Sequence, residues 1–232
     1  LAKQLASQPR RLSYRFLFIP GTIGSITWLA LHQEIIPRIQ HGLVLTCAGD
    51  AGPVTYKKTR HGDAAIDRAM RHVLRTSGAA HRIEEFHPYG YDERQYGSPG
   101  INLSVGSLMR SIHGTFPEYH TSADNLDFIK PEFLADTLAK ALEAFEVLEH
   151  NARYTNLKPM CEPRLGKYGL YGGGGGQRTG EFSELALLWV LNQSDGNTDL
   201  LAIAEKSGMT FRKILTAAQA LEAAGLLRKE TP

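Results

Sequence analysis

The sequence predicts an α/β fold with a mainly parallel sheet flanked by helices, followed by a small winged-helix domain. Between residues 14 and 150, short apolar segments of strand length alternate with segments of helical periodicity, and glycine or proline separates many of them. These two observations predict the sheet domain. A third observation predicts the second domain, because closely spaced helical segments and a strand-like segment follow residue 183.

The first predicted elements are a strand and a helix. Residues 14–19 alternate and are rich in aromatic and branched side chains, so we predict a buried strand that ends at Pro20. Small residues then allow a tight turn into a helix over residues 26–31. Residues 42–48 are apolar and bounded by glycines, which predicts a second strand that delivers Asp50 to a strand end.

The next segment, residues 53–58, is predicted to be a solvated edge strand. Its run Tyr56-Lys57-Lys58-Thr59-Arg60 could suggest phosphate binding, but lysines that protect a strand edge explain it better. An amphipathic helix over residues 63–75 follows. Its predicted inward residues are Ile66, Met70, Val73 and Leu74.

The remaining elements of this domain are two strands and a long helix. Strands are predicted over residues 81–86 and 101–108, with an irregular loop over residues 87–100 between them. Pro131 suits the first turn of the helix. Its predicted inward stripe consists of Phe133, Leu134, Leu138, Leu142, Phe145 and Leu148.

The predicted domains are residues 1–152, a linker over 153–180, and a winged helix over 181–232. Periodicity lapses between residues 151 and 180, and the Gly172–Gly176 run favours a linker. A nucleotide-binding role for that run is weak, because no Lys-Ser/Thr follows it. Helices over residues 184–191, 200–204 and 210–224, with a strand after Gly225, are typical of a winged helix.

The winged helix could place Phe211, Arg212 and Lys213 in DNA, but its charge argues against that. From residue 180 onward, five basic residues face seven acidic ones, and DNA affinity depends on neutralising several phosphates. We therefore expect no nucleic-acid partner and favour packing or partner contact. Whether the chain forms a homo-oligomer is open.

Composition sets broad limits on the protein. With 232 residues, 42% of them hydrophobic, the chain can bury a medium core and a small one. A net charge of +2 gives no electrostatic case for an anionic membrane, and no run of about 18 apolar residues predicts a membrane span. The two cysteines, Cys47 and Cys161, suit a reducing cytoplasm. Residues 1–7 resemble a helix entered midway, so we expect a truncated chain.

The segment from Glu118 to Leu126 is the most informative part of the chain. It reads Glu-Tyr-His-Thr-Ser-Ala-Asp-Asn-Leu and places His120 just before a polar, hydroxyl-rich turn. A histidine at such a position can bind a metal, although a lone surface or capping histidine is the commoner case.

This segment resembles the last zinc-ligand segment of the co-catalytic zinc aminopeptidases. More narrowly, the chain is similar to bacterial aminopeptidase-like proteins that carry a C-terminal winged-helix domain. The phrases that match are residues 14–20, 22–26, 90–96 and 98–103. The resemblance implies a zinc-exopeptidase-like fold, two zinc ions and cleavage of a peptide or of an amide in a small molecule. It also implies that the first histidine ligand and the bridging aspartate precede residue 1.

The expected metal ligands are Asp50 and His120. Asp50 lies among small residues, where its carboxylate can approach a metal or can form a simple Asx turn. One departure from the family matters, because Gly21 occupies a position that is usually glutamate and so provides no base or ligand. Two ligands are fewer than the three expected at a catalytic zinc. We therefore predict no catalytic residue here and an impaired hydrolase.

The loop around Tyr91 and Arg94 is the expected substrate-binding region. The resemblance implies that Arg94 faces the site and pairs with a substrate carboxylate or a polarised oxygen, with Tyr91 as a neighbouring donor. The alternative is a local ion pair on a solvated loop. Asp50, Arg94 and His120 are all expected beyond the carboxyl ends of strands. Two functions remain open, a zinc-dependent aminopeptidase-like hydrolase and a non-catalytic binding or regulatory protein.

Overall fold

The computed structural model describes residues 1–170 and 183–231. The chain divides into two compact units, Leu1–Glu149 and His150–Pro232. The glycine run Gly172–Gly176, which the sequence predicts to be part of a linker, lies outside the described residues. Among the described helices, none has the length and apolar character needed to cross a membrane.

The first unit contains a four-stranded mixed sheet in the order β1-β4-β2-β3. The strands are β1 (Gly42–Leu45), β2 (Val54–Lys57), β3 (His81–Glu84) and β4 (Val105–Met109). β1 is parallel to β4 and β2 is parallel to β3, whereas β2 and β4 are antiparallel. The predicted fold class, a mostly parallel sheet flanked by helices, is confirmed.

β2 is an interior strand, so the prediction of a solvated edge strand is wrong. All four of its residues are buried. The lysine that seemed to protect an edge, Lys57, forms a buried ion pair with Glu93. A long flexible cation can lie inside a protein when a carboxylate and a carbonyl compensate its charge, and the sequence of one strand does not reveal such a partner.

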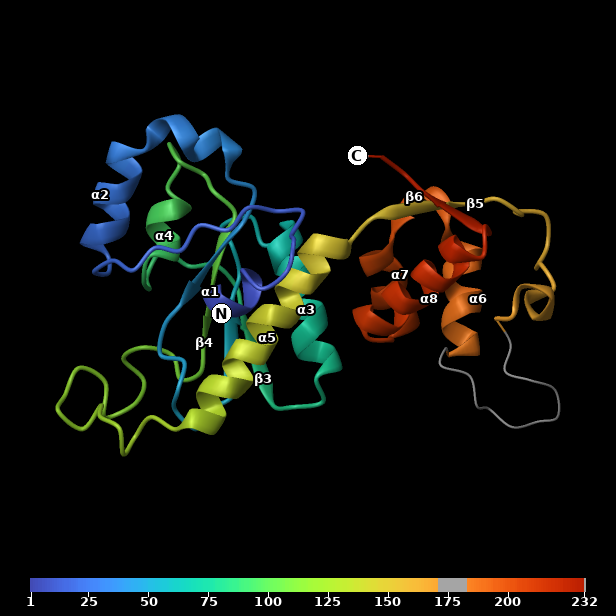
Figure 1. The fold of residues 1–232 in the computed structure, drawn as a ribbon. Helices are drawn as coiled ribbons and strands as arrows, with labels where there is room; N and C mark the ends of the chain where they lie inside the picture. Colours follow the sequence, from blue (N-terminus) through green and yellow to red (C-terminus); the bar gives the residue numbers. More distant parts are fainter. Residues whose placement is uncertain (171–182, 232) are drawn as a thin grey trace. The chain divides into compact units, whose positions relative to one another are not determined.

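The helices of this unit cover both faces of the sheet. α2 (Ile23–Leu31) and α4 (Glu93–Tyr96) lie on one side, whereas α3 (Ala65–Thr76) and α5 (Pro131–His150) lie on the other (Figure 1). A short α1 (Ala2–Leu5) precedes them, and a 3₁₀ helix spans Gln33–Arg38.

The buried faces of α3 and α5 differ in how well the sequence predicts them. All four residues predicted to face inward from α3 are buried. In α5 only Leu148 of the predicted stripe is buried, and Leu134 is 45% exposed. The buried stripe of α5 includes small residues at helical spacing, Thr137, Ala141 and Ala144. Helix propensity and apolar size cannot distinguish these two stripes, because packing selects the face that fits.

Residues 14–19 do not form the predicted strand. The segment is assigned to neither a helix nor a strand, and Phe18 is 91% exposed. Side chains fix its start instead, because Glu149 of α5 accepts hydrogen bonds from the Leu12 amide and the Tyr14 hydroxyl. The Tyr14 ring packs on Phe145, with ring centroids 5.5 Å apart. A segment with alternating side chains forms a strand only where a sheet edge is available for pairing.

The second unit is the predicted winged helix. It contains α6 (Glu184–Gln193), α7 (Leu200–Ser207) and α8 (Phe211–Ala223), with a sheet in the order β6-β5-β7. β5 (Arg153–Asn156) pairs antiparallel with both β6 (Asp195–Asp199) and β7 (Leu227–Lys229). β5 falls inside the predicted linker, so that prediction is wrong for these four residues. They look irregular in sequence because a short central strand needs little periodicity of its own.

Candidate functional site

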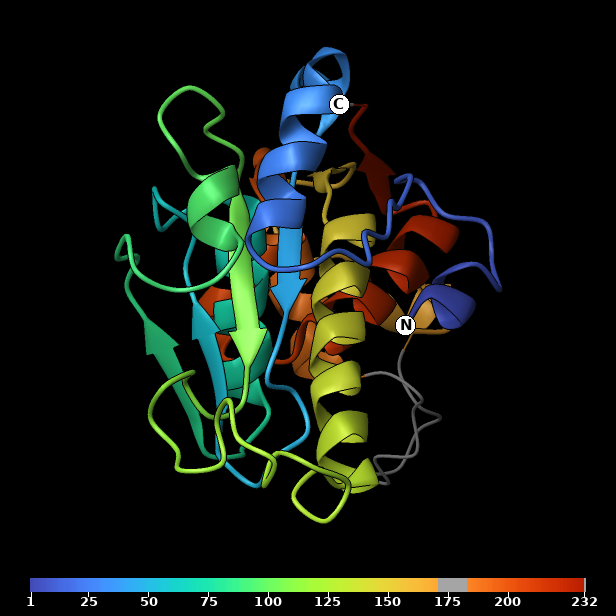
Figure 2. The ribbon, with the colours of Figure 1, turned by 90° about the vertical axis from the view of Figure 1, so that its left-hand side faces the viewer.

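The polarity of the strands separates the predicted site residues. Asp50 follows β1 and His120 follows β4, and these parallel strands end at the same edge of the sheet. Arg94 follows β3, which runs in the opposite direction to β4. α4 and the loop after β4 accordingly lie toward opposite ends of β4 (Figure 2). Arg94 thus follows the carboxyl end of a strand, as expected, but because the sheet is mixed β3 ends at the opposite edge from β1 and β4.

Asp50 is buried, at 2% exposure, and its carboxylate is well supplied with hydrogen bonds. Oδ1 accepts from the Gly52 amide at 2.8 Å, which is the Asx turn considered above, and from the Ser111 hydroxyl at 2.5 Å. The Ser111 amide donates to Oδ2 at 3.2 Å. Asp50 thus joins the end of β1 to the start of the loop after β4. A metal-ligand role for Asp50 stays a prediction.

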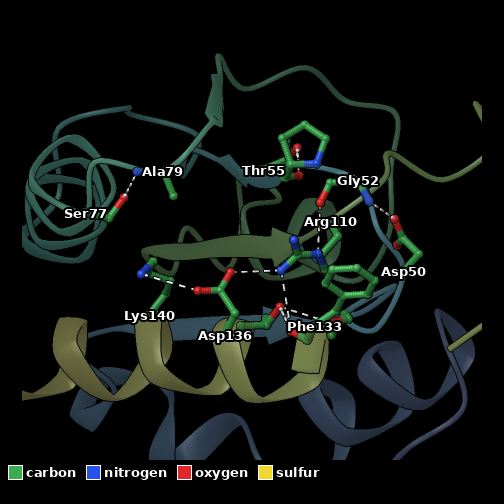
Figure 3. Close-up of polar contacts among 12 residues, drawn as sticks. Asp50, Gly52, Thr55, Ser77, Ala79, Arg110, Phe133, Asp136 and Lys140 are labelled. Carbon is green, nitrogen blue, oxygen red and sulfur yellow. Dashed lines mark hydrogen bonds and ion pairs between the residues drawn. The ribbon is translucent and has the colours of Figure 1, made fainter. Parts of the chain in front are cut away.

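Arg110 connects this corner to α5 (Figure 3). Its Nε donates to the Gly52 carbonyl at 2.9 Å, and its Nη1 lies 2.9 Å from the Asp136 carboxylate. The guanidinium also lies over the Phe133 ring, 4.7 Å from the centroid. A planar cation with several donors can hold a loop and a helix together in this way. The backbone around Asp50 is therefore fixed by neighbours from three segments.

His120 lies in a different environment. It is exposed, its φ of +59° is in the left-handed region, and its ring stacks on Tyr119 with centroids 3.9 Å apart. Tyr119 in turn packs near His113, with centroids 6.4 Å apart. Within residues 1–170 and 183–231, no three His, Cys, Asp or Glu side chains are grouped so that they could hold a metal ion. The described donors therefore do not fit a catalytic zinc site, which needs three protein ligands.

Cys47 lies close to this corner but is not an activated nucleophile. Burial raises the pKa of its thiol, and the nearby carboxylates of Asp50 and Asp124 act in the same direction. Thr46 donates a weak contact to the sulfur at 3.8 Å, which opposes the shift. A thiol with a raised pKa stays protonated near neutral pH and is a poor nucleophile.

The sequence does not predict the buried ion pair between Lys57 and Glu93. The two side chains are 4% and 0% exposed, and Lys57 Nζ lies 2.7 Å from Glu93 Oε1. Lys57 also donates to the Tyr89 carbonyl at 2.6 Å, and the Tyr91 amide donates to the Glu93 carboxylate at 3.1 Å. The pair therefore fixes the backbone of residues 89–91 on both sides of Gly90. No spacing rule connects a strand lysine with a glutamate that begins a helix 36 residues later.

Gly21 and Tyr91 meet at the same place. A Cβ added at Gly21 would overlap the Tyr91 ring, with Cζ, the hydroxyl oxygen and Cε1 as its nearest atoms. The phenol ring thus fills the volume into which a side chain at position 21 would project. The structure therefore places Tyr91 next to Gly21, and no residue pattern indicates this.

Two buried polar groups beside the ion pair have no hydrogen-bond partner among the described residues. They are the Ser107 hydroxyl and Nδ1 of His113. Ser107 is paired with Lys57 in the ladder between β4 and β2, so both side chains are on the same face of the sheet. Burial lowers the pKa of His113, and the nearby Lys57 and His87 also lower it, whereas Glu93 raises it. His113 is thus held in the neutral form, which can accept or donate one hydrogen bond at each ring nitrogen.

Arg94 has a less definite position. It is half-buried, and its Nε has no partner among the described residues. The adjacent Asp92 accepts a hydrogen bond from Ser25 of α2 at 2.8 Å. The local-ion-pair alternative is not the main feature of this loop, because Glu93 pairs with Lys57 instead. Substrate binding by Arg94 stays a prediction.

Comparisons with known proteins agree with this architecture. A protein of Clostridium acetobutylicum, provisionally named a polysaccharide biosynthesis protein with an aminopeptidase-like domain, is 51% identical over 228 residues, which are 98% of this chain and 52% of that protein. A crystal structure from the same organism, provisionally described as a peptidase, is 50% identical with a TM-score of 0.90 and covers 99% of this chain and 51% of its own. The chain therefore spans about half the length of these two relatives.

A more distant likeness is to a zinc aminopeptidase from Bacillus subtilis. It is 17% identical with a TM-score of 0.44, over 55% of this chain and 32% of its own.

Residues 152–229 match the family described as winged helix-turn-helix, in agreement with the second unit. Residues 1–151 match the family described as Domain of unknown function (DUF4910), which is well over half of the chain. The chain therefore belongs to the DUF4910 family.

Proposed function

We propose that this protein binds a peptide or an amide-bearing small molecule on an aminopeptidase-like scaffold, and that zinc-dependent hydrolysis is impaired in this chain. One observation carries the proposal. Tyr91 fills the volume at Gly21, and the resemblance to zinc aminopeptidases implies an acidic side chain at this position that acts as base or ligand. Removal of a general base typically costs on the order of 10² to 10⁴ in rate.

The groups near Tyr91 suit an amide ligand. The Tyr91 and His113 rings lie with centroids 6.2 Å apart, and His113 is buried with one ring nitrogen unpartnered among the described residues. A phenol hydroxyl and a neutral imidazole offer both donors and acceptors, which match the N–H and C=O of an amide. Buried polar groups that lack a partner favour a ligand or a water that supplies one.

Asp50 and His120 are the described residues that would hold zinc. In the resembling enzymes zinc polarises the carbonyl and supplies a hydroxide. Asp50 is already committed to Ser111 and Gly52, and His120 is exposed and stacked on Tyr119. Two donors with these other contacts support weak metal binding by the described residues.

The relative's name widens the substrate class. That protein is named for polysaccharide biosynthesis as well as for its aminopeptidase-like domain. We therefore include amides of small sugar precursors, alongside short peptides, among the ligands to be tested.

A zinc titration by calorimetry, joined to an aminoacyl-anilide hydrolysis assay, tests the proposal. We expect weak or substoichiometric zinc binding and little hydrolysis, but measurable anilide binding. Asp50→Asn and His120→Ala are the matched variants, and each should reduce whatever zinc binding is observed. Tight stoichiometric zinc binding with rapid hydrolysis would overturn the claim of impairment, and absence of anilide binding would overturn the ligand class.

A non-catalytic regulatory protein is the second candidate function. It is favoured by the excess of acidic over basic residues after residue 180, which suits protein contact better than DNA contact. Binding of random-sequence duplex DNA with a steep salt dependence would count against that interpretation of the winged helix.

A further inference from the structure

Hydrogen bonds to two buried side chains hold the backbone of the loop that carries Tyr91. Lys57 Nζ donates to the Tyr89 carbonyl at 2.6 Å, and the Tyr91 amide donates to both oxygens of Glu93, at 3.1 and 3.2 Å. Lys57 also lies over the Phe86 ring, 5.4 Å from its centroid. Backbone groups before and after Gly90 are thus bonded to the two members of one ion pair.

The close approach of the loop to the Lys57–Glu93 ion pair requires glycine at position 90. Its φ is +153°, and a Cβ there would lie 2.7 Å from Lys57 Nζ and would collide with Glu93 Oε1. Side chains of L-residues rarely adopt this backbone conformation. The loop therefore passes directly over the ion pair, and a side chain at position 90 would lift it away.

The result of this arrangement is the position of the Tyr91 ring. The ring overlaps the volume of a side chain at position 21 and faces His113, whose Nδ1 is unpartnered among the described residues. Tyr91 itself is half-buried, so part of its surface is open to a ligand. The ring and any side chain at position 21 compete for one volume.

We propose that Tyr91 takes the place of a side chain at position 21 and determines which ligands the site accepts, and that the buried Lys57–Glu93 pair positions it. The ligand part of this inference rests on the proposed function. Lys57 and Glu93 act through Tyr91 and are positioning residues. A bulky phenol at the wall of a site limits the size of the ligand group that can lie against it.

A double-mutant cycle tests the competition for volume. Gly21→Ala should lower Tm by several degrees when Tyr91 is present, because the added methyl group overlaps the ring. The shift should nearly vanish in a Tyr91→Ala background and persist in a Tyr91→Phe background, which keeps the ring. An equal Tm shift from Gly21→Ala in all three backgrounds would show that the Tyr91 ring does not compete with a side chain at position 21.

A separate experiment tests whether Lys57 and Glu93 position the Tyr91 ring. Replacing both members of the pair, Lys57→Met with Glu93→Met, leaves no lone buried charge and removes the acceptor of the Tyr91 amide. The Gly21→Ala shift should then shrink, because the ring can move aside, and an unchanged shift would overturn the positioning role. If that variant does not fold, Gly90→Ala displaces the same loop and is read in the same way.

Ligand selection is measured by calorimetric titration with alanine and leucine para-nitroanilides. Tyr91→Ala should change the ratio of the two Kd values by roughly 10-fold in favour of leucine, whereas Tyr91→Phe should leave the ratio unchanged. An unchanged ratio in Tyr91→Ala would overturn the specificity role. If neither the wild-type chain nor Tyr91→Ala binds either compound, the proposed ligand class and the specificity role are both overturned. The double-mutant cycle of Tm values separately decides whether the Tyr91 ring occupies the volume of a side chain at position 21.

Discussion

The two units of the chain bury very different kinds of residue. In the second unit the described core is almost entirely apolar, with Leu187, Leu200, Ile203 and Ile214 fully buried. In the first unit, charged and polar side chains are buried beside the sheet. In the described part of the second unit, Ser194 is the only buried residue with a polar or charged side chain. Burial of charges lowers stability unless they are paired, so the first unit depends on buried polar pairing that the second unit does not need.

The largest test of this difference is loss of the Glu93 carboxylate. Glu93→Ala leaves the buried Lys57 ammonium without its carboxylate partner and should reduce the free energy of unfolding by about 3–5 kcal/mol. Urea denaturation, with hydrogen exchange on the amides of β2 and α3, measures the effect. The control is Glu85→Ala, because Glu85 is 78% exposed and its pair with Lys58 contributes at most about 1 kcal/mol. Equal losses from the two variants would contradict the importance of burial.

A second test removes the carboxylate that joins β2 to α3. Asp67 accepts from the Tyr56 hydroxyl and the Thr59 amide, each at 2.8 Å, and from the Ala64 amide at 2.9 Å. Asp67→Ala leaves these buried donors unsatisfied and should cost about 2–4 kcal/mol of unfolding free energy. The exposed neighbour Asp63 provides the control, since Asp63→Ala should change stability little. If Asp67→Ala lowered the unfolding free energy no more than Asp63→Ala does, water would be replacing the lost hydrogen bonds.

A smaller effect is expected in the second unit, where a helix cap is the clearest polar contribution. Asp199 accepts from the Ala202 amide at 2.7 Å at the start of α7. Asp199→Ala should cost about 1 kcal/mol, and Asp199→Asn should cost less because asparagine also caps helices. Thermal unfolding followed by exchange at the α7 amides measures both. If Asp199→Asn cost as much as Asp199→Ala, charge rather than capping would be responsible.

The smallest expected effect is a pH dependence confined to the first unit. Burial lowers the pKa of His113 in the folded state, so the unfolded chain takes up a proton first as the pH falls. Stability should therefore decrease as the pH is lowered through about 6.5, the pKa of an unperturbed histidine, until the lowered pKa is reached. His41 has a pKa lowered by burial and acts in the same direction.

His113→Gln isolates the His113 contribution, and the variant should show a flatter dependence of Tm on pH between about 7 and 5. No histidine occurs after residue 150, so amides of α6 to α8 should show little change over this range. An identical pH profile for the variant and the wild type would exclude His113 as the source.

The sequence predicts the elements of the molecule better than their surroundings. α2, α3, α5 and the three helices of the second unit all lie where periodicity predicts them, because helical spacing of apolar residues is a local property. The interior position of β2 and the missing strand over residues 14–19 are not local. They depend on which edges of the sheet are available, and no segment carries that information alone.

The candidate site is predicted less completely than the fold. Asp50, His120, Tyr91 and Arg94 attract attention through their residue types and through the family resemblance. Lys57, Glu93 and His113 are missed, because a buried ion pair and an unpartnered histidine have no signature in spacing. The closeness of Tyr91 to Gly21 is missed for the same reason.

The sequence by itself determines that a mostly parallel α/β unit precedes a winged helix and that Gly21 provides no functional side chain. Tertiary structure alone decides that the volume at Gly21 is filled by Tyr91, that Lys57 is buried, and that Arg94 lies toward the opposite end of β4 from Asp50 and His120. The physical reason is that patterns along a chain fix local conformation and apolar faces, whereas strand direction and side-chain packing arise only when distant segments compete for the same space.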